Sequence, residues 1–188
     1  MILNLVTSNE HKLEEYRNGL YPLGIEVKHL QADCDEIQAD TLHEVVLACM
    51  ERLKRDGYRD FILDDSGMFV PALNGFPGVY SAYVMQTIGC QGMLRLLDGL
   101  NRSAHFECCI GVCSDELGEF TLTGRSPGRI ITEKRGEGGF GYDPIFMPDG
   151  QELTFAEMDM VTKNHHSHRG KAMVELAREL KQRMEGKK

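Results

Sequence analysis

The sequence predicts an α/β fold, because apolar runs typical of buried strands alternate with segments of helical periodicity. Residues 2–7 and 61–64 are short apolar runs, whereas residues 41–57 carry apolar side chains at helical spacing. A chain of 188 residues corresponds to one domain, so we expect residues 1–188 to form it, with room for two lobes.

The expected helices and strands follow one another along the chain. They are a helix over 8–20, a strand over 25–30, the helix over 41–57, the strand over 61–64, a helix over 86–98, two strands joined by a turn within 104–130, and an amphipathic helix over 167–184. Thr41 and Glu44 form a capping-box pattern, and Gly57 marks the end of that helix. Thr154 and Glu157 repeat the capping-box pattern.

The composition is that of an ordinary soluble globular protein, with 41% apolar and 27% charged residues. The formal net charge of −8 argues against broad binding to nucleic acid or to a membrane surface, because such polyanions would be repelled. It leaves open a small anionic substrate, which meets only the charges near its own site. No apolar stretch is long enough for a signal peptide or a transmembrane span, so we expect a cytoplasmic protein.

Six cysteines are spread along the chain without CxxC spacing. They are Cys34, Cys49, Cys90, Cys108, Cys109 and Cys113. Because no metal-binding or redox motif is present, we expect reduced thiols, as is usual in an intracellular protein.

A polar segment, TSNEHK, occupies residues 7–12 between an expected strand and an expected helix. Free N–H groups at a helix start bind anions, and Lys12 would add a positive charge there. Ser8 or Asn9 can instead simply cap the helix, which is the usual role of such residues. The segment therefore predicts either a phosphate site or an ordinary helix cap.

Two adjacent carboxylates, Asp64 and Asp65, end the apolar run that begins at residue 61. Carboxylates at a strand end are a common way to hold Mg²⁺, which takes few protein oxygens and keeps several waters. Neighbouring side chains of a regular strand point to opposite faces, so the two cannot both enter one site. The alternative is a solvated strand end followed by a loop rich in proline and glycine.

A glycine-rich stretch, GEGGFGYDPIF, covers residues 136–146. Glycines let a backbone approach a ligand closely, and Phe140 and Tyr142 could stack on a nucleobase. Asp143 and Pro144 then favour a turn. The alternative is a glycine-rich hairpin whose two aromatic side chains belong to the core.

The segment KNHHSHRGKA, residues 163–172, combines basic residues with three histidines. The histidines lack the i, i+4 spacing of zinc ligands on a helix, and no CxxC pair lies nearby, so zinc is not expected. Ser167 is a natural cap for the last helix and would place His168 and Arg169 in its first turn, beside Lys163. These donors suit an anionic ligand, or they form a basic, solvated helix start.

Together, these four segments contain the parts of a Mg²⁺-dependent nucleotide enzyme: an anion loop with a lysine, carboxylates for a metal, a glycine–aromatic platform and a cluster of basic side chains. Each segment alone has a structural explanation, so the prediction depends on the set. The sequence contains neither GxxxxGK[ST] nor GxGxxG, so P-loop and Rossmann modes of nucleotide binding are not supported.

The same segments, in this order and spacing, resemble the inosine triphosphate pyrophosphatase (Ham1-like) family. The matching stretches are TSNEHK, DDSGMFVPALNGFPGVYSAYV, GGFGYDPIF, TFAEM and KNHHSHRGKA, and they extend over nearly the whole chain. The resemblance implies Mg²⁺-dependent hydrolysis of non-standard purine nucleoside triphosphates, such as ITP, dITP and XTP, to the monophosphate and pyrophosphate. It also implies an elongated, two-lobed α/β fold with a long mixed central β-sheet flanked by helices, an active cleft between the lobes, and a homodimer.

Carried over by motif, the resemblance implies a role for each matching residue. Asp65 would be the catalytic base and a metal ligand, with Glu36 as the second metal acid and Glu44 as its alternative. The nucleotide-binding residues would be Thr7, Ser8, Asn9, Glu10, His11 and Lys12 for the triphosphate, Ser66 as a further contact, Phe140, Gly141, Tyr142 and Asp143 for the base, and Lys163, His168 and Arg169 for base and phosphates. Within this set, Phe140 is the expected stacking residue.

One position departs from the family pattern. Many relatives carry a phosphate-contacting lysine five residues after the glutamate that is Glu44 here, whereas this chain has Cys49. Arg52 or Lys54, about one turn further along the helix, could replace that contact.

Two other functions remain open from the sequence. A Maf-like pyrophosphatase acting on other nucleotides shares the fold type, although the SHR and FGYD motifs argue against it. A nucleotide-binding regulator without catalysis is the alternative from a different class. The presence of Lys12, Asp65 and Lys163 argues against that alternative.

Overall fold

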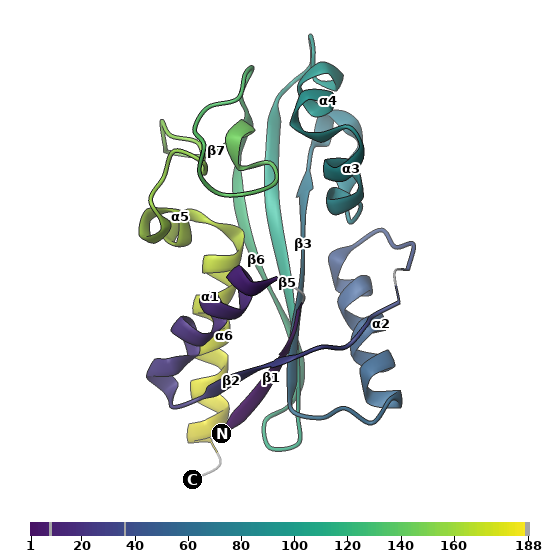
Figure 1. The fold of residues 1–188 in the computed structure, drawn as a ribbon, viewed down its shortest axis with the longest axis vertical. Coiled ribbons are helices and arrows are strands. Elements are labelled where there is room, and N and C mark those ends of the chain that lie inside the picture. The colour runs from purple at the N-terminus through teal and green to yellow at the C-terminus, as the bar shows by residue number, and fades with distance from the viewer. Residues whose placement is uncertain (8, 36, 187–188) are drawn as a thin grey trace. The chain divides into compact units, whose positions relative to one another are not determined.

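The computed structural model describes residues 1–7, 9–35 and 37–186, without the side chain of His11. Within these residues it contains a seven-stranded mixed β-sheet flanked by helices, which confirms the predicted α/β fold class (Figure 1). The strands are β1 (Ile2–Val6), β2 (Glu26–Leu30), β3 (Phe61–Phe69), β4 (Pro77–Gly78), β5 (Ser103–Ser114), β6 (Gly118–Ile130) and β7 (Phe146–Pro148). Their order in the sheet is β2-β1-β3-β5-β6-β7, and β4 pairs with β3.

Helices and strands interleave along the chain, as the sequence pattern predicts, but two consecutive helices on either side of Ile88 replace the single helix predicted over 86–98. The α-helices are α1 (Glu10–Leu20), α2 (Leu42–Arg55), α3 (Ser81–Thr87), α4 (Gly89–Leu96), α5 (Met160–His166) and α6 (His168–Glu185), and the short 3-10 helices are η1 (Tyr21–Leu23), η2 (Pro71–Leu73) and η3 (Asp143–Ile145). Among the described residues, no helix combines the length and apolarity needed to cross a membrane.

The chain divides into two compact units. The first unit consists of Met1–Asp65, Cys109–Thr123 and Ala172–Lys188. The second unit consists of Ser66–Cys108 and Gly124–Lys171. Strands β3, β5 and β6 and helix α6 therefore each contribute residues to both units.

The first unit is built on parallel strands. β1 pairs in parallel with both β2 and β3, and Val6 lies opposite Leu63. Figure 1 shows α1 and α6 on one side of these strands and α2 on the other. The packing of α1 on α6 leaves little space, because a Cβ on Gly19 would lie 2.5 Å from the end of the Met173 side chain.

Helix α2 begins at the predicted capping box. The Thr41 hydroxyl accepts a hydrogen bond from the Glu44 N–H at 3.2 Å, and the Glu44 carboxylate accepts one from the Thr41 N–H at 3.0 Å. This reciprocal pair satisfies two N–H groups that the first turn of a helix leaves without partners. The helix then buries Leu42, Val46 and Leu53 in the first unit.

The second capping-box pattern does not start a helix. The Glu157 carboxylate accepts a hydrogen bond from the Thr154 N–H at 2.8 Å. The Thr154 hydroxyl, however, donates to the Arg135 carbonyl at 3.0 Å, and the chain forms only a turn here. The next helix, α5, instead begins at Asp159, whose carboxylate accepts from the Thr162 N–H.

The second unit has an aromatic core. Phe106 meets Phe146 edge-on with ring centroids 4.7 Å apart, and Phe155 lies 5.1 Å from Phe146. Phe146 and Phe155 are almost completely buried. Edge-to-face and tilted contacts of this kind add stability beyond the apolar area they bury.

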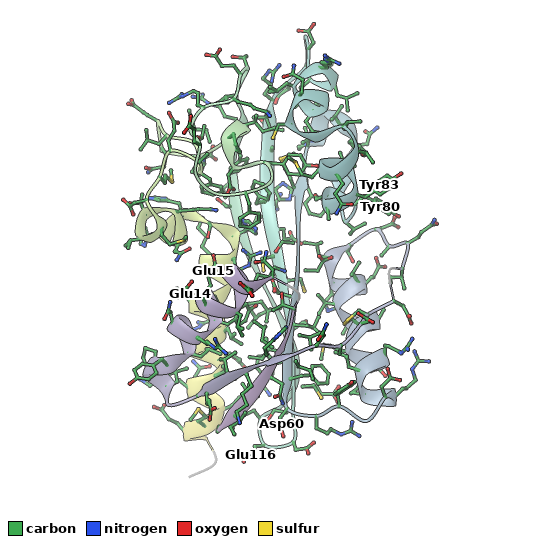
Figure 2. The ribbon with its side chains drawn as sticks, viewed as in Figure 1. Glu14, Glu15, Asp60, Tyr80, Tyr83 and Glu116 are labelled. Atoms are coloured by element: carbon green, nitrogen blue, oxygen red, sulfur yellow. A yellow bond between two sulfur atoms is a disulfide. The ribbon has the colours of Figure 1, made fainter. Side chains whose placement is uncertain are left out.

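Helix α3 of the second unit carries exposed tyrosines. Tyr80, which precedes the helix, and Tyr83 within it project outward (Figure 2), and they are 43% and 68% exposed. Phe76, just before β4, is 38% exposed. The segment between β3 and α4 therefore presents aromatic side chains on the surface of its unit.

Two of the six cysteines form a disulfide, so the prediction of reduced thiols was wrong for this pair. Cys34 and Cys49 are joined, with their Cα atoms 5.0 Å apart. The bond attaches the segment after β2 to helix α2. Cysteine spacing could not show it, because the fold brings together residues separated by 15 positions.

Reducing this disulfide is expected to lower the free energy of unfolding by about 3 kcal/mol, the chain-entropy value for a loop of this length. Urea unfolding of the protein with and without reductant measures the loss. Cys34→Ser, at a partly exposed position, should show the same loss without reductant and no further loss with it. Equal urea midpoints for oxidised and reduced wild-type protein would contradict this expectation.

Candidate functional site

The two adjacent acids lie in the middle of β3. The prediction that they end a strand was therefore wrong. β3 continues to Phe69 because its last residues pair with β4, with Met68 opposite Gly78. The Asp64 side chain is fully buried. As whole residues, Asp64 and Asp65 are both partly exposed. Because neighbouring side chains of a strand point to opposite faces, the Asp65 side chain points away from the buried Asp64 carboxylate.

In the first unit, the buried Asp64 side chain holds Lys12. The Lys12 ammonium lies 3.1 Å from Asp64 Oδ1 and donates to the Asp64 carbonyl at 3.3 Å. The Lys12 side chain is only 18% exposed. A buried carboxylate requires such a partner, because an unpaired charge is costly in the protein interior. Lys12 is therefore held at Asp64, the residue that precedes Asp65 on β3.

The start of α1 has the hydrogen bonds of a helix cap. Asn9 Oδ1 accepts from the Lys12 N–H at 3.4 Å, and Asn9 N–H donates to Thr7 Oγ1 at 3.1 Å. Glu10 is exposed in the first turn. Ser8 and the side chain of His11 lie outside the described residues. Capping by Asn9 and anion binding at the same helix end are compatible, since a cap satisfies only some of the N–H groups there.

In the second unit, the glycine-rich stretch folds around the Asp143 carboxylate. Asp143 Oδ2 accepts from the Phe140 N–H at 2.7 Å and from the Lys163 ammonium at 2.6 Å. Lys163 lies over the Phe140 ring, 4.7 Å from its centroid. The structure thus brings together three of the predicted base-binding residues.

The two aromatic residues of this stretch have different environments. Phe140 is 47% exposed, whereas Tyr142 is 4% exposed. The Tyr142 hydroxyl donates to the Ser81 carbonyl at 2.9 Å, and burial raises the pKa of the phenol. The ring available for stacking is therefore that of Phe140, while Tyr142 belongs to the core.

Ser81 is a structural residue of this region that the sequence did not single out. Its hydroxyl accepts from the Met68 N–H at 2.8 Å and donates to the Gly78 carbonyl at 2.6 Å. Together with its carbonyl bond to Tyr142, this joins β3, β4 and the glycine-rich stretch. No sequence signal marks it beyond its place at the start of a helix.

The first turn of α6 is buried in the second unit. Ser167 caps it, because its hydroxyl accepts from the Gly170 N–H at 3.0 Å. The His168 ring stacks on Phe106 with centroids 4.7 Å apart. Arg169 is only 6% exposed, and its Nη2 lies 3.5 Å from the Ser66 hydroxyl. Arg169 is therefore held beside the residue that follows Asp65.

The metal-ligand predictions can be compared with the structure only in part, because Glu36 lies outside the described residues. In the described ranges, no three His, Cys, Asp or Glu side chains gather as a metal cluster. Mg²⁺ does not require one, since it commonly binds one or two carboxylates together with substrate phosphates. Asp65, a partly exposed residue of β3, fits that mode of binding.

Glu44, the alternative metal acid, is engaged in the capping box. Its Oε2 accepts hydrogen bonds from the Thr41 hydroxyl, the Thr41 N–H and the Asp40 N–H, all between 3.0 and 3.1 Å. These bonds hold the pKa of the Glu44 carboxyl below its usual range, and the bond from the Thr41 hydroxyl contributes most to this lowering. The structure therefore gives Glu44 a role in starting α2.

The basic residues considered as substitutes at the Cys49 position form surface ion pairs in the first unit. Arg52 contacts Asp35 at 2.9 Å and Asp56 at 2.8 Å. Lys54 contacts Glu119 at 2.8 Å, and the hydrogen bonds that its ammonium donates to Glu119 and Glu51 raise its pKa. Cys49 itself is buried and linked to Cys34.

Comparison with protein families gives a match over most of the chain. Residues 3–179 match the model of the family described as the Ham1 family. The chain belongs to the Ham1 family. This confirms the resemblance found in the sequence motifs.

Proteins named dITP/XTP pyrophosphatase share much of this sequence. The chain is 54% identical over 185 residues to the dITP/XTP pyrophosphatase of Thermococcus kodakarensis. The aligned region covers 98% of this chain and 100% of that protein. It is 47% identical to the dITP/XTP pyrophosphatase of Pyrococcus horikoshii, over 92% of this chain and 93% of that protein. The solved structure of a HAM1 protein from Coxiella burnetii has a TM-score of 0.85 and 31% identity, covering 97% of this chain and 99% of that chain.

Proposed function

We propose that this protein hydrolyses non-standard purine nucleoside triphosphates, namely ITP, dITP and XTP, to the nucleoside monophosphate and pyrophosphate. The observation that carries the proposal is the 54% identity, over nearly the whole chain, to the protein of Thermococcus kodakarensis named dITP/XTP pyrophosphatase. Two lysines support the proposal. Lys12 pairs with Asp64 and Lys163 pairs with Asp143, so each lysine is a fixed cation within a predicted nucleotide-binding segment. Removing such nucleotides would cleanse the cellular nucleotide pool.

Each segment has a part in this proposal. Residues 7–12 bind the triphosphate, with Lys12 supplying a positive charge, and Ser66 adds a polar contact. The segment with Phe140, Gly141, Tyr142 and Asp143 forms the base site, in which Phe140 stacks on the base and the buried Tyr142 supports the segment from the core. Lys163, His168 and Arg169 reach base and phosphates. Asp65 and Glu36 would hold Mg²⁺, which neutralises the negative charge that develops on the phosphates.

The residues of this chain then assist attack by water on the α-phosphorus. The water oxygen forms a bond to that phosphorus while the bond to the bridging oxygen breaks, and pyrophosphate leaves. Asp65, as an ionised carboxylate, orients the water and accepts its proton. Lys12, held by Asp64 at 3.1 Å, places a positive charge where the phosphates gain negative charge.

Selectivity follows from the hydrogen-bonding groups of the base. Hypoxanthine and xanthine present a 6-keto acceptor, whereas adenine presents an amino donor there. Arg169 and the N–H groups of the glycine-rich stretch would donate to the keto oxygen, and adenine would leave these donors without acceptors. Guanine shares the keto group, so the shape of the site around its 2-amino group must exclude it.

A turnover assay tests the proposed function. The purified protein with ITP and Mg²⁺ is expected to release pyrophosphate and IMP, and chelation of the metal should stop the reaction. Orthophosphate as the sole initial product would overturn the proposal. Extending the assay to pyrimidine and modified nucleotides tests the Maf-like alternative, and absence of turnover on the whole panel would favour a nucleotide-binding regulator.

We also propose that the protein is cytoplasmic, since its substrates belong to the soluble nucleotide pool. In addition, we propose that it is a homodimer. The exposed side chains of Tyr80 and Tyr83 (Figure 2) are suited to a contact between two copies. Phe76 is a further exposed aromatic residue of the same segment. Light scattering of the purified protein measures its mass directly. A monomeric mass at all concentrations tested would contradict the dimer.

A further inference from the structure

Ser126 is a buried polar residue of β6 that lies outside the predicted nucleotide-binding segments. Buried and exposed positions alternate along β6 from Gly124 to Ile130, and Ser126 is on the buried face with no exposed surface. Its hydroxyl donates to the His166 carbonyl at 2.8 Å. A buried hydroxyl requires such a partner, because burial without a hydrogen bond is costly. The bond joins β6 to the end of α5, 40 residues further along the chain.

The carbonyl that accepts this bond lies where two helices meet. His166 is the last residue of α5, and α6 begins at His168. Ser167 between them has extended backbone angles, φ −72° and ψ 154°, so the helical path is broken at this one residue. The last carbonyls of a helix have no partner within the helix, and Ser126 supplies a donor to one of them. Ser126 therefore fixes the point at which the chain leaves α5.

The first turn of α6 is packed closely against its neighbours. The Ser167 hydroxyl accepts from the Gly170 N–H at 3.0 Å, and a Cβ on Gly170 would overlap the carbonyl oxygen of Asn164 in α5. The His168 ring stacks on Phe106 of β5 with centroids 4.7 Å apart. Because close-packed interiors transmit displacements, a shift at the end of α5 also moves the first turn of α6.

Arg169 is the side chain of this turn whose position affects selectivity. It is 6% exposed, and its Nη2 lies 3.5 Å from the Ser66 hydroxyl. In the proposed function, the guanidinium donates to the 6-keto oxygen of the base. A donor that must meet one acceptor depends on its exact place, and a 1 Å misplacement of a contacting group can cost about 100-fold in rate.

We infer that Ser126 is a positioning residue, which supports the selectivity for keto-purine nucleotides by holding the start of α6, and with it Arg169, through the His166 carbonyl. This inference deepens the proposed function and depends on it. Ser126 acts through Arg169 and not by contact with the nucleotide. Its removal therefore affects the choice between keto and amino bases.

The experiment compares Ser126→Ala with wild-type protein in steady-state hydrolysis of ITP and ATP. Alanine removes the hydroxyl and leaves the His166 carbonyl without this donor. The ratio of kcat/KM for ITP to that for ATP is expected to fall about tenfold, because Arg169 is displaced but still present. The fraction of folded enzyme cancels in this ratio, so a loss of stability alone would not change it. An unchanged ratio would overturn the inference.

Combining Ser126→Ala with Arg169→Ala tests whether the effect passes through Arg169. Two changes that act through the same group are not additive. Once Arg169 is absent, Ser126→Ala should lower the ITP/ATP ratio no further. An additional tenfold fall in the double variant would mean that Ser126 acts by another route, and the inference would fail.

Ser114→Ala is the matched control. Ser114 is also a buried serine on a strand, β5, and its hydroxyl donates to Asp60 Oδ1 at 2.8 Å. Neither Ser114 nor Asp60 belongs to a predicted nucleotide-binding segment. Ser114→Ala should therefore keep the wild-type ITP/ATP ratio. An equal fall in both variants would mean that the loss of any buried serine bond produces the effect, which would contradict a specific role for Ser126.

Ser126→Cys keeps the inference testable if Ser126→Ala does not fold. A thiol is a weak hydrogen-bond donor, so the ITP/ATP ratio should fall in this variant as well, and an unchanged ratio would again overturn the inference. Wild-type activity decides the proposed function separately. No pyrophosphate release by wild-type protein refutes that function and the inference with it, whereas an active wild type with unchanged Ser126 variants refutes only the role of Ser126.

Discussion

Replacing Asp65 by asparagine is expected to slow ITP hydrolysis by roughly 10²–10⁴-fold, as is typical when a positioned acid–base group is removed. The amide is nearly the same size as the carboxylate, but it carries no charge and cannot take the proton of the attacking water. Pyrophosphate release at saturating ITP and Mg²⁺ measures the effect on kcat. A rate near that of the wild type would exclude Asp65 from catalysis.

The control for this variant is Asp149→Asn. Asp149 is exposed in the turn that follows β7, so its change also removes one carboxylate from the protein. It should leave kcat unchanged. Thermal melting of both variants then shows whether any loss at Asp65 comes from unfolding, because Asp65 is partly buried on a central strand.

Replacing Arg169 by alanine is expected to reduce the preference for ITP over ATP by roughly 100-fold. A site whose donors pair with the keto group can discriminate by ~10⁴-fold or more, and Arg169 is one of several proposed donors. The loss should come mainly from slower ITP hydrolysis. The measurement is kcat/KM for ITP, XTP, ATP and GTP, and the keto explanation fails if the ITP/ATP ratio is unchanged.

Arg178→Ala provides the comparison on the same helix. Arg178 lies two to three turns further along α6, where it is exposed and pairs with Glu175. Its removal takes away the same charge from the same helix without changing the buried environment of Arg169. The ITP/ATP ratio of this variant should equal that of the wild type.

Local rules predicted most of the fold correctly. The capping box at Thr41 and Glu44 and the two long strands that became β5 and β6 are features in which neighbouring residues decide the structure. The same rule failed at Thr154, because its hydroxyl found a partner in the carbonyl of Arg135, far along the chain. Local patterns predict correctly when no distant partner competes for the same group.

The extent of β3 shows a second limit. Polar and glycine residues from Asp64 to Gly67 suggested that the strand had ended, since such residues are depleted in strands. The strand nevertheless continues to Phe69, because β4 pairs with its last residues. The burial of Asp64 likewise depends on Lys12, which is 52 residues away in sequence.

The candidate site was predicted as a set of residue types, but its internal contacts were not. The sequence indicated that Lys163 and Asp143 belong to nucleotide-binding segments, and nothing in it showed that they form an ion pair across 20 residues. The disulfide between Cys34 and Cys49 was missed for the same reason. Pairings of this kind depend on the path of the chain between the partners.

The glycine before Phe140 changes what a glycine-rich stretch signifies in this protein. Such stretches suggest room kept free for a ligand's phosphate or base. At Gly139 the space is already filled, because the oxygen of Asp143 lies where a side chain would begin. The absence of a side chain at Gly139 therefore makes room for an anionic group of the protein itself, which also accepts a hydrogen bond from the Phe140 N–H.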